Sequence, residues 1–204
     1  MQLVEEVVTF ATDPDLDVQS ATAKIVEAMA TDNVLRELLA SPSLATLFGS
    51  EVCSAAGPER TVALAGAMEE RVQEHPDLTM PAMALAEEAG DVEFAGRIAE
   101  RALSAAAPGD HADQLGDVAA ELLAIRRGEG RLGDALELAE QWCARIPEDE
   151  SLQQQRARLL ARLAALEGDD PTLDGIFTDV VPDEQRRRAL AARDRFANRT
   201  LLYS

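Results

Sequence analysis

The chain of 204 residues is poor in aromatic residues, which make up 3% of it, and in cysteine, of which it has two. Alanine and leucine are abundant, and valine, isoleucine and threonine show little alternation, so the composition argues against a β-sheet and predicts an all-α fold. Cys53 and Cys143 are 90 positions apart and in no metal-like spacing. This excludes a disulfide-rich scaffold and favours a reducing cytoplasm, with both cysteines as small buried side chains.

The N-terminus lacks the features of a signal peptide, and the chain lacks long apolar runs. The stretch MQLVEEVVTFATD has no basic start, and Glu5 and Glu6 interrupt its apolar residues. No uninterrupted apolar run approaches the roughly 20 residues that a membrane-spanning helix needs. We therefore expect a soluble, cytoplasmic protein. Arginine outnumbers lysine 18 to 1, a usage bias that suggests a bacterial coding sequence rich in G and C.

Positive charge is scarce over most of the chain. The formal net charge is −19, and residues 1–150 hold 30 acidic residues against 10 basic ones, whereas residues 151–204 hold 8 against 9. An acidic surface repels phosphate backbones and anionic lipids and attracts basic protein surfaces. The charge therefore argues against nucleic acid and membranes as partners and favours a basic protein. Solubility alone is the other explanation of this charge.

Proline and glycine divide the chain into segments with helical periodicity. We expect helices at about 59–74, 80–89, 91–106, 113–128 and 131–145, then one that ends at Gly168, a short one, and a final one after Pro182. Before the break at Gly57 and Pro58 we expect three short helices, the last of them interrupted by Pro42.

Two segments, AGDVEFAGRIAERALSAAAPGD (89–110) and EGRLGDALELAEQWCARIPED (129–149), repeat the same order of residues. Aligned on Gly90 and Gly130, they share an apolar residue, two alanines, a packing residue and a proline; the pairs are Val92 and Leu132, Ala95 and Ala135, Ala99 and Ala139, Ala102 and Trp142, and Pro108 and Pro147. Glycine can adopt a left-handed conformation after the first helix, small alanines let two helices approach closely, and proline ends the second helix.

Apolar residues on the helices at 113–128 and 131–145 form two stripes, which we expect to face each other. The stripes consist of Leu115, Val118, Ala119, Leu122 and Leu123, and of Leu132, Ala135, Leu136, Ala139, Trp142, Cys143 and Ile146. Trp142 is therefore expected in the core rather than stacked on a ligand.

This pattern resembles the tetratricopeptide repeat (TPR) family, whose helix–turn–helix unit has about 34 residues. The resemblance covers about residues 77–147 with degenerate flanking units, although the two glycines are 40 positions apart and Met83 and Leu123 stand where the family commonly has a small residue. It implies an all-α fold: a right-handed superhelix of antiparallel helical hairpins, a TPR-like α-solenoid, over residues 57–204, with a C-terminal capping helix. Residues 1–56 would form an N-terminal helical segment packed on the repeats.

Members of this family generally bind peptides or helices of other proteins along a concave surface lined by the first helix of each hairpin. The alignment implies the groove residues Asp77, Met80, Ala84 and Glu87 in one unit and Asp117, Glu121, Ala124 and Arg127 in the next. The lining is acidic and lacks the lysines and asparagines with which some members grip a C-terminal carboxylate. We therefore expect a non-enzymatic scaffold that binds a basic or amphipathic segment of a protein partner. The alternative is a ligand-sensing or regulatory all-helical module with a small-molecule pocket between residues 1–56 and the repeats.

The remaining polar motifs predict neither catalysis nor a metal or cofactor. Asp13, Asp15 and Asp17 have the spacing of the first three EF-hand ligands, but Val18 and Lys24 stand where that loop needs glycine and glutamate. A helix-capping turn is the expected structure.

Three other polar features have similarly simple explanations. GDDPTLD (168–174) is similar to the aspartate-rich motifs of isoprenoid synthases but is expected to begin a capped helix. His75 and His111 lie beside turns, without a nucleophile in catalytic spacing. The basic stretch QRRRALAARDR (185–195) is expected to be a solvated helix face rather than a nucleic-acid site.

Overall fold

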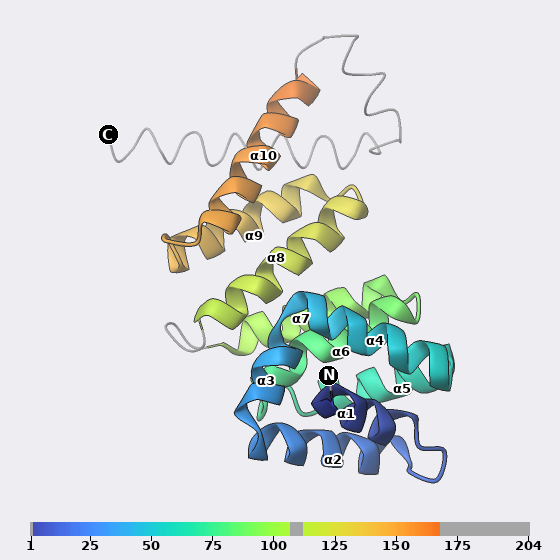
Figure 1. Cartoon of the computed structure of the whole chain (residues 1–204). Coiled ribbons are helices and arrows are strands. Elements are labelled where there is room, and N and C mark those ends of the chain that lie inside the picture. The colour runs from blue at the N-terminus through green and yellow to red at the C-terminus, as the bar shows by residue number, and fades with distance from the viewer. Residues whose placement is uncertain (1, 107–111, 168–204) are drawn as a thin grey trace. The chain divides into compact units, whose positions relative to one another are not determined.

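The computed structural model describes residues 2–106 and 112–167 (Figure 1). This part of the chain is all-α, as predicted, and its consecutive helices pack in pairs. Its elements are α1 (Gln2–Thr12), α2 (Val18–Thr31), α3 (Asn33–Ala40), α4 (Pro42–Ala56), α5 (Pro58–Glu69), the 3₁₀ helix η1 (Pro76–Leu78), α6 (Thr79–Glu88), α7 (Val92–Ala105), α8 (Ala112–Gly128), α9 (Leu132–Arg145) and α10 (Glu150–Glu167). Within the described ranges, no helix is both long and apolar enough to cross a bilayer.

The chain divides into two compact units, residues 1–118 and residues 119–204, which we call the first unit and the second unit. The boundary that the sequence suggested at residues 56 and 57 lies inside the first unit and stays a prediction. The short helix expected after Gly168 and the final capping helix expected after Pro182 lie outside the described residues. His111, the acidic stretch 168–174 and the basic stretch 185–195 lie outside them as well.

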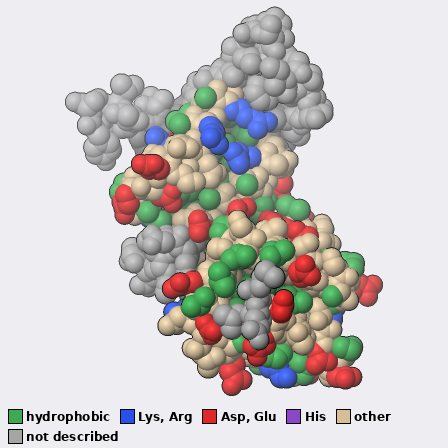
Figure 2. Space-filling model, in the orientation of Figure 1, with side chains coloured by type: hydrophobic (Ala, Val, Ile, Leu, Met, Phe, Trp, Pro, Cys, Tyr) green, Lys and Arg blue, Asp and Glu red, His purple; other side chains and the backbone are tan. Residues whose placement is uncertain are grey.

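Charge is divided unevenly between the two units. Residues 1–118 contain 22 acidic residues against 6 basic ones, a net charge of −16, whereas residues 119–204 contain 16 against 13. On the face drawn in Figure 2, carboxylates are spread around the first unit, and a group of arginines lies over the second. The acidic character of the protein therefore belongs mainly to the first unit.

The first unit contains one more N-terminal helix than the sequence suggested. Pro42 does not interrupt a helix but begins α4, with Ser41 as the preceding cap residue. Proline is favoured at the first helical position because its missing N–H would have no partner there in any case. The residues after Pro42 therefore form a full helix of 15 residues.

The central helix of the first unit is α6, which packs against α3, α4, α5 and α7. Its eight residues from Thr79 to Ala86 are all buried. The approach of α4 is especially close, because a Cβ atom added at Gly49 would lie 2.8 Å from the Ala84 carbonyl oxygen. One turn further along α4, the Cys53 thiol donates a hydrogen bond to the Glu88 carbonyl at 3.4 Å. The N-terminal helices therefore cover one side of α6.

Arg60 of α5 holds the loop that connects α1 and α2. Its guanidinium donates hydrogen bonds to the backbone carbonyls of Ala11 at 2.9 Å, Asp13 at 2.7 Å and Leu16 at 2.9 Å. The last carbonyls of a helix have no donor within the helix itself. Arg60 therefore acts as a cap for α1 that is supplied by a distant part of the chain.

We expect Arg60→Met to lower the free energy of unfolding by about 1–2 kcal/mol, because half-buried carbonyls lose a charged donor. Arg60→Lys should recover only part of this loss, since a compact ammonium cannot reproduce the spread of a planar guanidinium. Urea unfolding followed by circular dichroism measures both variants. Arg71→Met is the control, because the Arg71 side chain forms no hydrogen bond or ion pair with a described residue. Equal midpoints for Arg60→Met and Arg71→Met would contradict the role of Arg60.

Candidate functional site

The helices that precede Gly90 and Gly130 end in the same way. In each case the glycine N–H donates to the carbonyl three residues earlier, and the next N–H donates to the carbonyl five residues earlier. These distances are 2.9 and 2.9 Å after α6, and 3.1 and 2.8 Å after α8. The φ angles of the two glycines are 87° and 73°, a left-handed conformation that glycine adopts at little cost. The predicted role of both glycines is confirmed.

The small residues of the repeated segments are also in the core. Ala95, Ala99, Ala135 and Ala139 are each 0% exposed. All residues of the two predicted apolar stripes on α8 and α9 are buried, at 8% exposure or less. The exposure of the first apolar residue of the repeat differs between the two hairpins. Val92 is 43% exposed, whereas Leu132 is 1% exposed.

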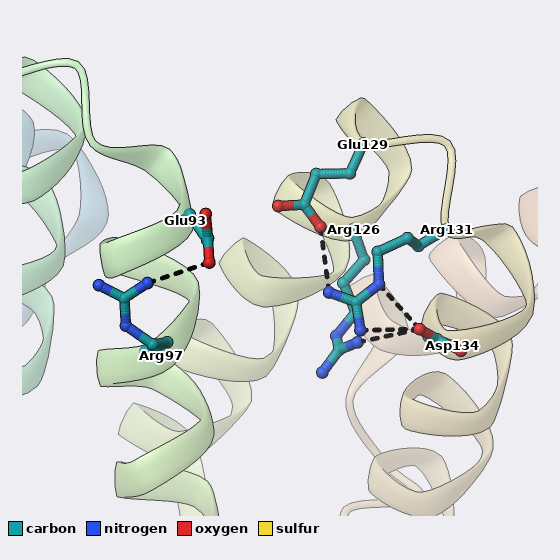
Figure 3. Close-up of polar contacts among 6 residues, drawn as sticks. All are labelled: Glu93, Arg97, Arg126, Glu129, Arg131 and Asp134. Atoms are coloured by element: carbon teal, nitrogen blue, oxygen red, sulfur yellow. Dashed lines mark hydrogen bonds and ion pairs between the residues drawn. The ribbon is translucent and has the colours of Figure 1, made fainter. Parts of the chain in front are cut away.

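Charged side chains also fix the turn between α8 and α9 in the second unit. Figure 3 shows the guanidinium groups of Arg126 and Arg131 directed toward Asp134, with nitrogen–oxygen distances of 3.4 Å and 2.7 Å. Arg131 also pairs with Glu129 at 3.2 Å. Burial alone would lower the pKa of Arg131, but the hydrogen bonds and charges of Asp134 and Glu129 outweigh it and raise this pKa. The three-residue spacing of Arg131 and Asp134 is the sequence signal that could have indicated this cluster.

The predicted groove residues of the first unit do not form an open surface. Met80 and Ala84 are each 5% exposed, because neighbouring helices cover α6. Asp77 is partly exposed and lies 3.8 Å from the Arg36 guanidinium, and Glu87 is partly exposed as well. Asp77 and Glu87 are therefore accessible to solvent, whereas Met80 and Ala84 belong to the core. The alignment on Gly90 and Gly130 shows only which positions of the repeat correspond to each other. It does not indicate that helices from residues 1–56 pack on α6 and bury Met80 and Ala84.

The other four predicted groove residues lie on α8. Asp117 is exposed, and Glu121, Ala124 and Arg127 are partly exposed. Their spacing of three or four residues places them on one face of this helix. The groove as a whole stays a prediction.

The aspartates between α1 and α2 form the capping turn that the sequence predicted. The Asp13 carboxylate accepts a hydrogen bond from the Asp15 N–H at 2.9 Å. Asp17 caps α2 by accepting from the Ser20 N–H at 2.8 Å, and this bond, with help from the Ser20 hydroxyl, holds the pKa of Asp17 below its usual value. Within the described ranges, no group of three or more His, Cys, Asp or Glu residues is arranged to hold a metal ion.

The cysteines and His75 form no nucleophilic arrangement in the described part of the chain. Cys143 is buried, and this burial raises the pKa of its thiol. A raised pKa keeps a thiol protonated and unreactive. Cys53 is half-buried in the contact between α4 and α6, and His75 directly precedes η1.

A groove with a volume of about 390 Å³ lies between α1, α2 and α3, and the sequence analysis missed it. It is lined by Glu6, Phe10, Lys24, Glu27, Ala28, Thr31, Asp32 and Leu35. The Lys24 ammonium lies 5.3 Å from the centre of the Phe10 ring. The Asp32 carboxylate accepts hydrogen bonds from two backbone N–H groups of α3. Among the described residues, the carboxylates of Glu6 and Glu27 have no hydrogen-bond or ion-pair partner.

A smaller pocket of about 110 Å³ lies between α2, α3 and the region around η1. It is lined by Val26, Met29, Ala30, Arg36, His75, Asp77 and Leu78. The ion pair of Arg36 and Asp77 is part of this lining. The pocket thus lies where residues 1–56 meet the segment that follows them.

Comparison with known proteins gives no family assignment, since the chain matches no protein-family model, no curated protein and no solved structure.

Proposed function

We propose that this protein is a non-enzymatic scaffold that binds a basic or amphipathic segment of a protein partner through the acidic surface of its first unit. The observation that carries the proposal is the net charge of −16 on residues 1–118. A field of this sign attracts a basic segment, accelerates its association and disfavours acidic competitors.

The basic residues of the first unit leave most of this charge available. Arg36, Arg97 and Arg101 each pair with one carboxylate. Arg60 instead donates to backbone carbonyls, and Lys24 lies over a phenylalanine ring. The unit has 22 acidic residues and only 6 basic ones. An external cation would therefore meet a large excess of carboxylates.

We further propose that the α6–α7 and α8–α9 hairpins are TPR-like units of a right-handed α-solenoid over residues 57–204. The shared glycine turns at Gly90 and Gly130 and the buried alanines that follow them support this proposal. First helices line the concave surface of such a solenoid. In the first unit, η1 would contribute Asp77 and α6 would contribute Glu87 to that surface, since Met80 and Ala84 are buried.

A fluorescein-labelled hexa-arginine peptide should bind the full chain with an affinity that depends strongly on salt. We expect its Kd to rise about tenfold or more between about 20 mM and about 150 mM salt, because the screening length falls to about 8 Å. Fluorescence anisotropy measures this Kd, and a labelled hexa-glutamate peptide is the control that should not bind. Absence of hexa-arginine binding at low salt would refute the proposed function. A pull-down at both salt concentrations then identifies a natural partner.

A ligand-sensing module is the second candidate function, and the small pocket between α2, α3 and η1 favours it. The pocket combines Arg36, His75 and Asp77 with apolar side chains, but its volume is about 110 Å³. Sites for drug-sized ligands have volumes of about 300–1,000 Å³. Only a ligand of a few heavy atoms would fit. A rise in melting temperature with a small carboxylate at high salt, together with no peptide binding, would favour the sensor over the scaffold.

A further inference from the structure

We propose that the groove between α1, α2 and α3 is the subsite that receives an arginine side chain of the basic partner segment. This inference rests on the proposed function and adds the location and chemistry of one contact. The groove has a volume of about 390 Å³ and lies within the first unit, which holds most of the negative charge.

The lining of the groove matches both parts of an arginine side chain. Glu6 of α1 and Glu27 of α2 are exposed carboxylates, and neither has a hydrogen-bond or ion-pair partner among the described residues. Phe10 and Leu35 add apolar surface to the same groove. A guanidinium offers five N–H donors in a planar fork, and its aliphatic stem packs on apolar surface. Two different helices therefore each contribute a carboxylate acceptor for a guanidinium to the same groove.

The groove already contains one cation of the chain itself, the ammonium of Lys24. This ammonium is 5.3 Å from the centre of the Phe10 ring, within the range of a cation–π contact. It forms no ion pair with a described residue, although Glu6, Glu27 and Asp32 line the same groove. A guanidinium is more weakly hydrated than an ammonium and also stacks on aromatic faces. The arginine of the partner would thus replace the flexible Lys24 side chain over the ring and leave Lys24 in solvent.

Two double variants test the role of the groove carboxylates. Glu6→Gln with Glu27→Gln removes two charges from the groove. Glu51→Gln with Glu59→Gln removes the same charge from exposed positions of α4 and α5 that do not line it. With labelled hexa-arginine at about 50 mM salt, we expect the groove variant to raise Kd about tenfold and the control variant less than about threefold.

Lys24→Met tests the role of the ring. We expect this variant to lower the Kd for hexa-arginine about threefold to tenfold, because Phe10 becomes free and a repelling charge is lost. Arg97→Met is a matched control. Arg97 also lies over a phenylalanine ring, 5.2 Å from the centre of Phe94, and pairs on the surface of α7 with Glu93 at 3.2 Å (Figure 3). Arg97→Met changes the net charge of the chain by the same amount as Lys24→Met but does not alter the lining of the groove.

The outcomes separate this inference from the proposed function. If the wild-type chain binds hexa-arginine and both double variants weaken binding equally, the groove assignment is overturned and the proposed function stands. If Lys24→Met and Arg97→Met have equal effects, the displacement of Lys24 is overturned. If the wild-type chain does not bind, the proposed function itself fails. Circular dichroism spectra equal to that of the wild type show that each variant is folded.

Discussion

Trp142→Ala should lower the free energy of unfolding of the second unit by about 3–5 kcal/mol, the range for a large buried aromatic side chain. Trp142 lies in α9 and is 2% exposed. The Arg145 guanidinium lies 4.9 Å from the centre of its ring. Removal of the indole would leave a cavity that packed helices can fill only in part, so both apolar burial and close contacts are lost.

Urea unfolding followed by far-ultraviolet circular dichroism is the suitable measurement, because Trp142 is the only tryptophan of the chain and fluorescence would be lost with it. Trp142→Phe should cost clearly less, since a ring still fills most of the site. Arg145→Met should cost no more than about 1 kcal/mol, the value of an exposed cation–π contact. An unchanged unfolding midpoint for Trp142→Ala would show that this side chain is not packed in the core.

Gly49→Ala should destabilise the first unit by about 1–3 kcal/mol, the usual cost of an overpacked core. A Cβ atom at position 49 would lie 2.8 Å from the carbonyl oxygen and 3.0 Å from the carbonyl carbon of Ala84. Both are backbone atoms of α6, so the clash is relieved only if one helix moves. Helix propensity alone favours alanine over glycine by about 1 kcal/mol. A net loss of stability would therefore show that the clash between α4 and α6 outweighs the higher helix propensity of alanine.

Gly66→Ala is the matched control for this substitution. Gly66 also lies within a helix, α5, but the nearest atom that its Cβ would meet is in the Phe94 ring, 4.0 Å away. We expect this variant to be more stable by up to about 1 kcal/mol, because propensity then acts without a clash. The two alanine variants should thus change the unfolding midpoint in opposite directions. A stabilising Gly49→Ala would contradict the close approach of α4 and α6.

Most helices of this fold could be predicted because their boundaries depend on local chemistry. Gly90 and Gly130 have the left-handed conformation that a helix end requires, and Asp17 caps α2 through its own neighbours. The helix that begins at Pro42 is not predictable in this way, because proline is common both just after a helix and at its first position. Ser41 does not distinguish the two cases, since it is the last cap residue of α3 and also the first cap residue of α4.

The candidate site could not be predicted in the same way, because its parts meet only through tertiary packing. Glu6 and Glu27 come from different helices, and nothing in their sequence spacing indicates a shared groove. The burial of Met80 and Ala84 depends on helices that belong to no repeat. The contacts of Arg60 join residues that are 44 to 49 positions apart. Such long-range contacts leave no periodic signal in one sequence.

Lys24 is the only lysine among the 204 residues, and it lines the groove between α1, α2 and α3. An enzyme that acylates lysine side chains therefore has a single lysine to modify in this sequence. Acetylation there would convert the ammonium into a neutral amide and weaken its contact with Phe10. A dye attached to the Lys24 side chain would report directly on occupancy of the groove.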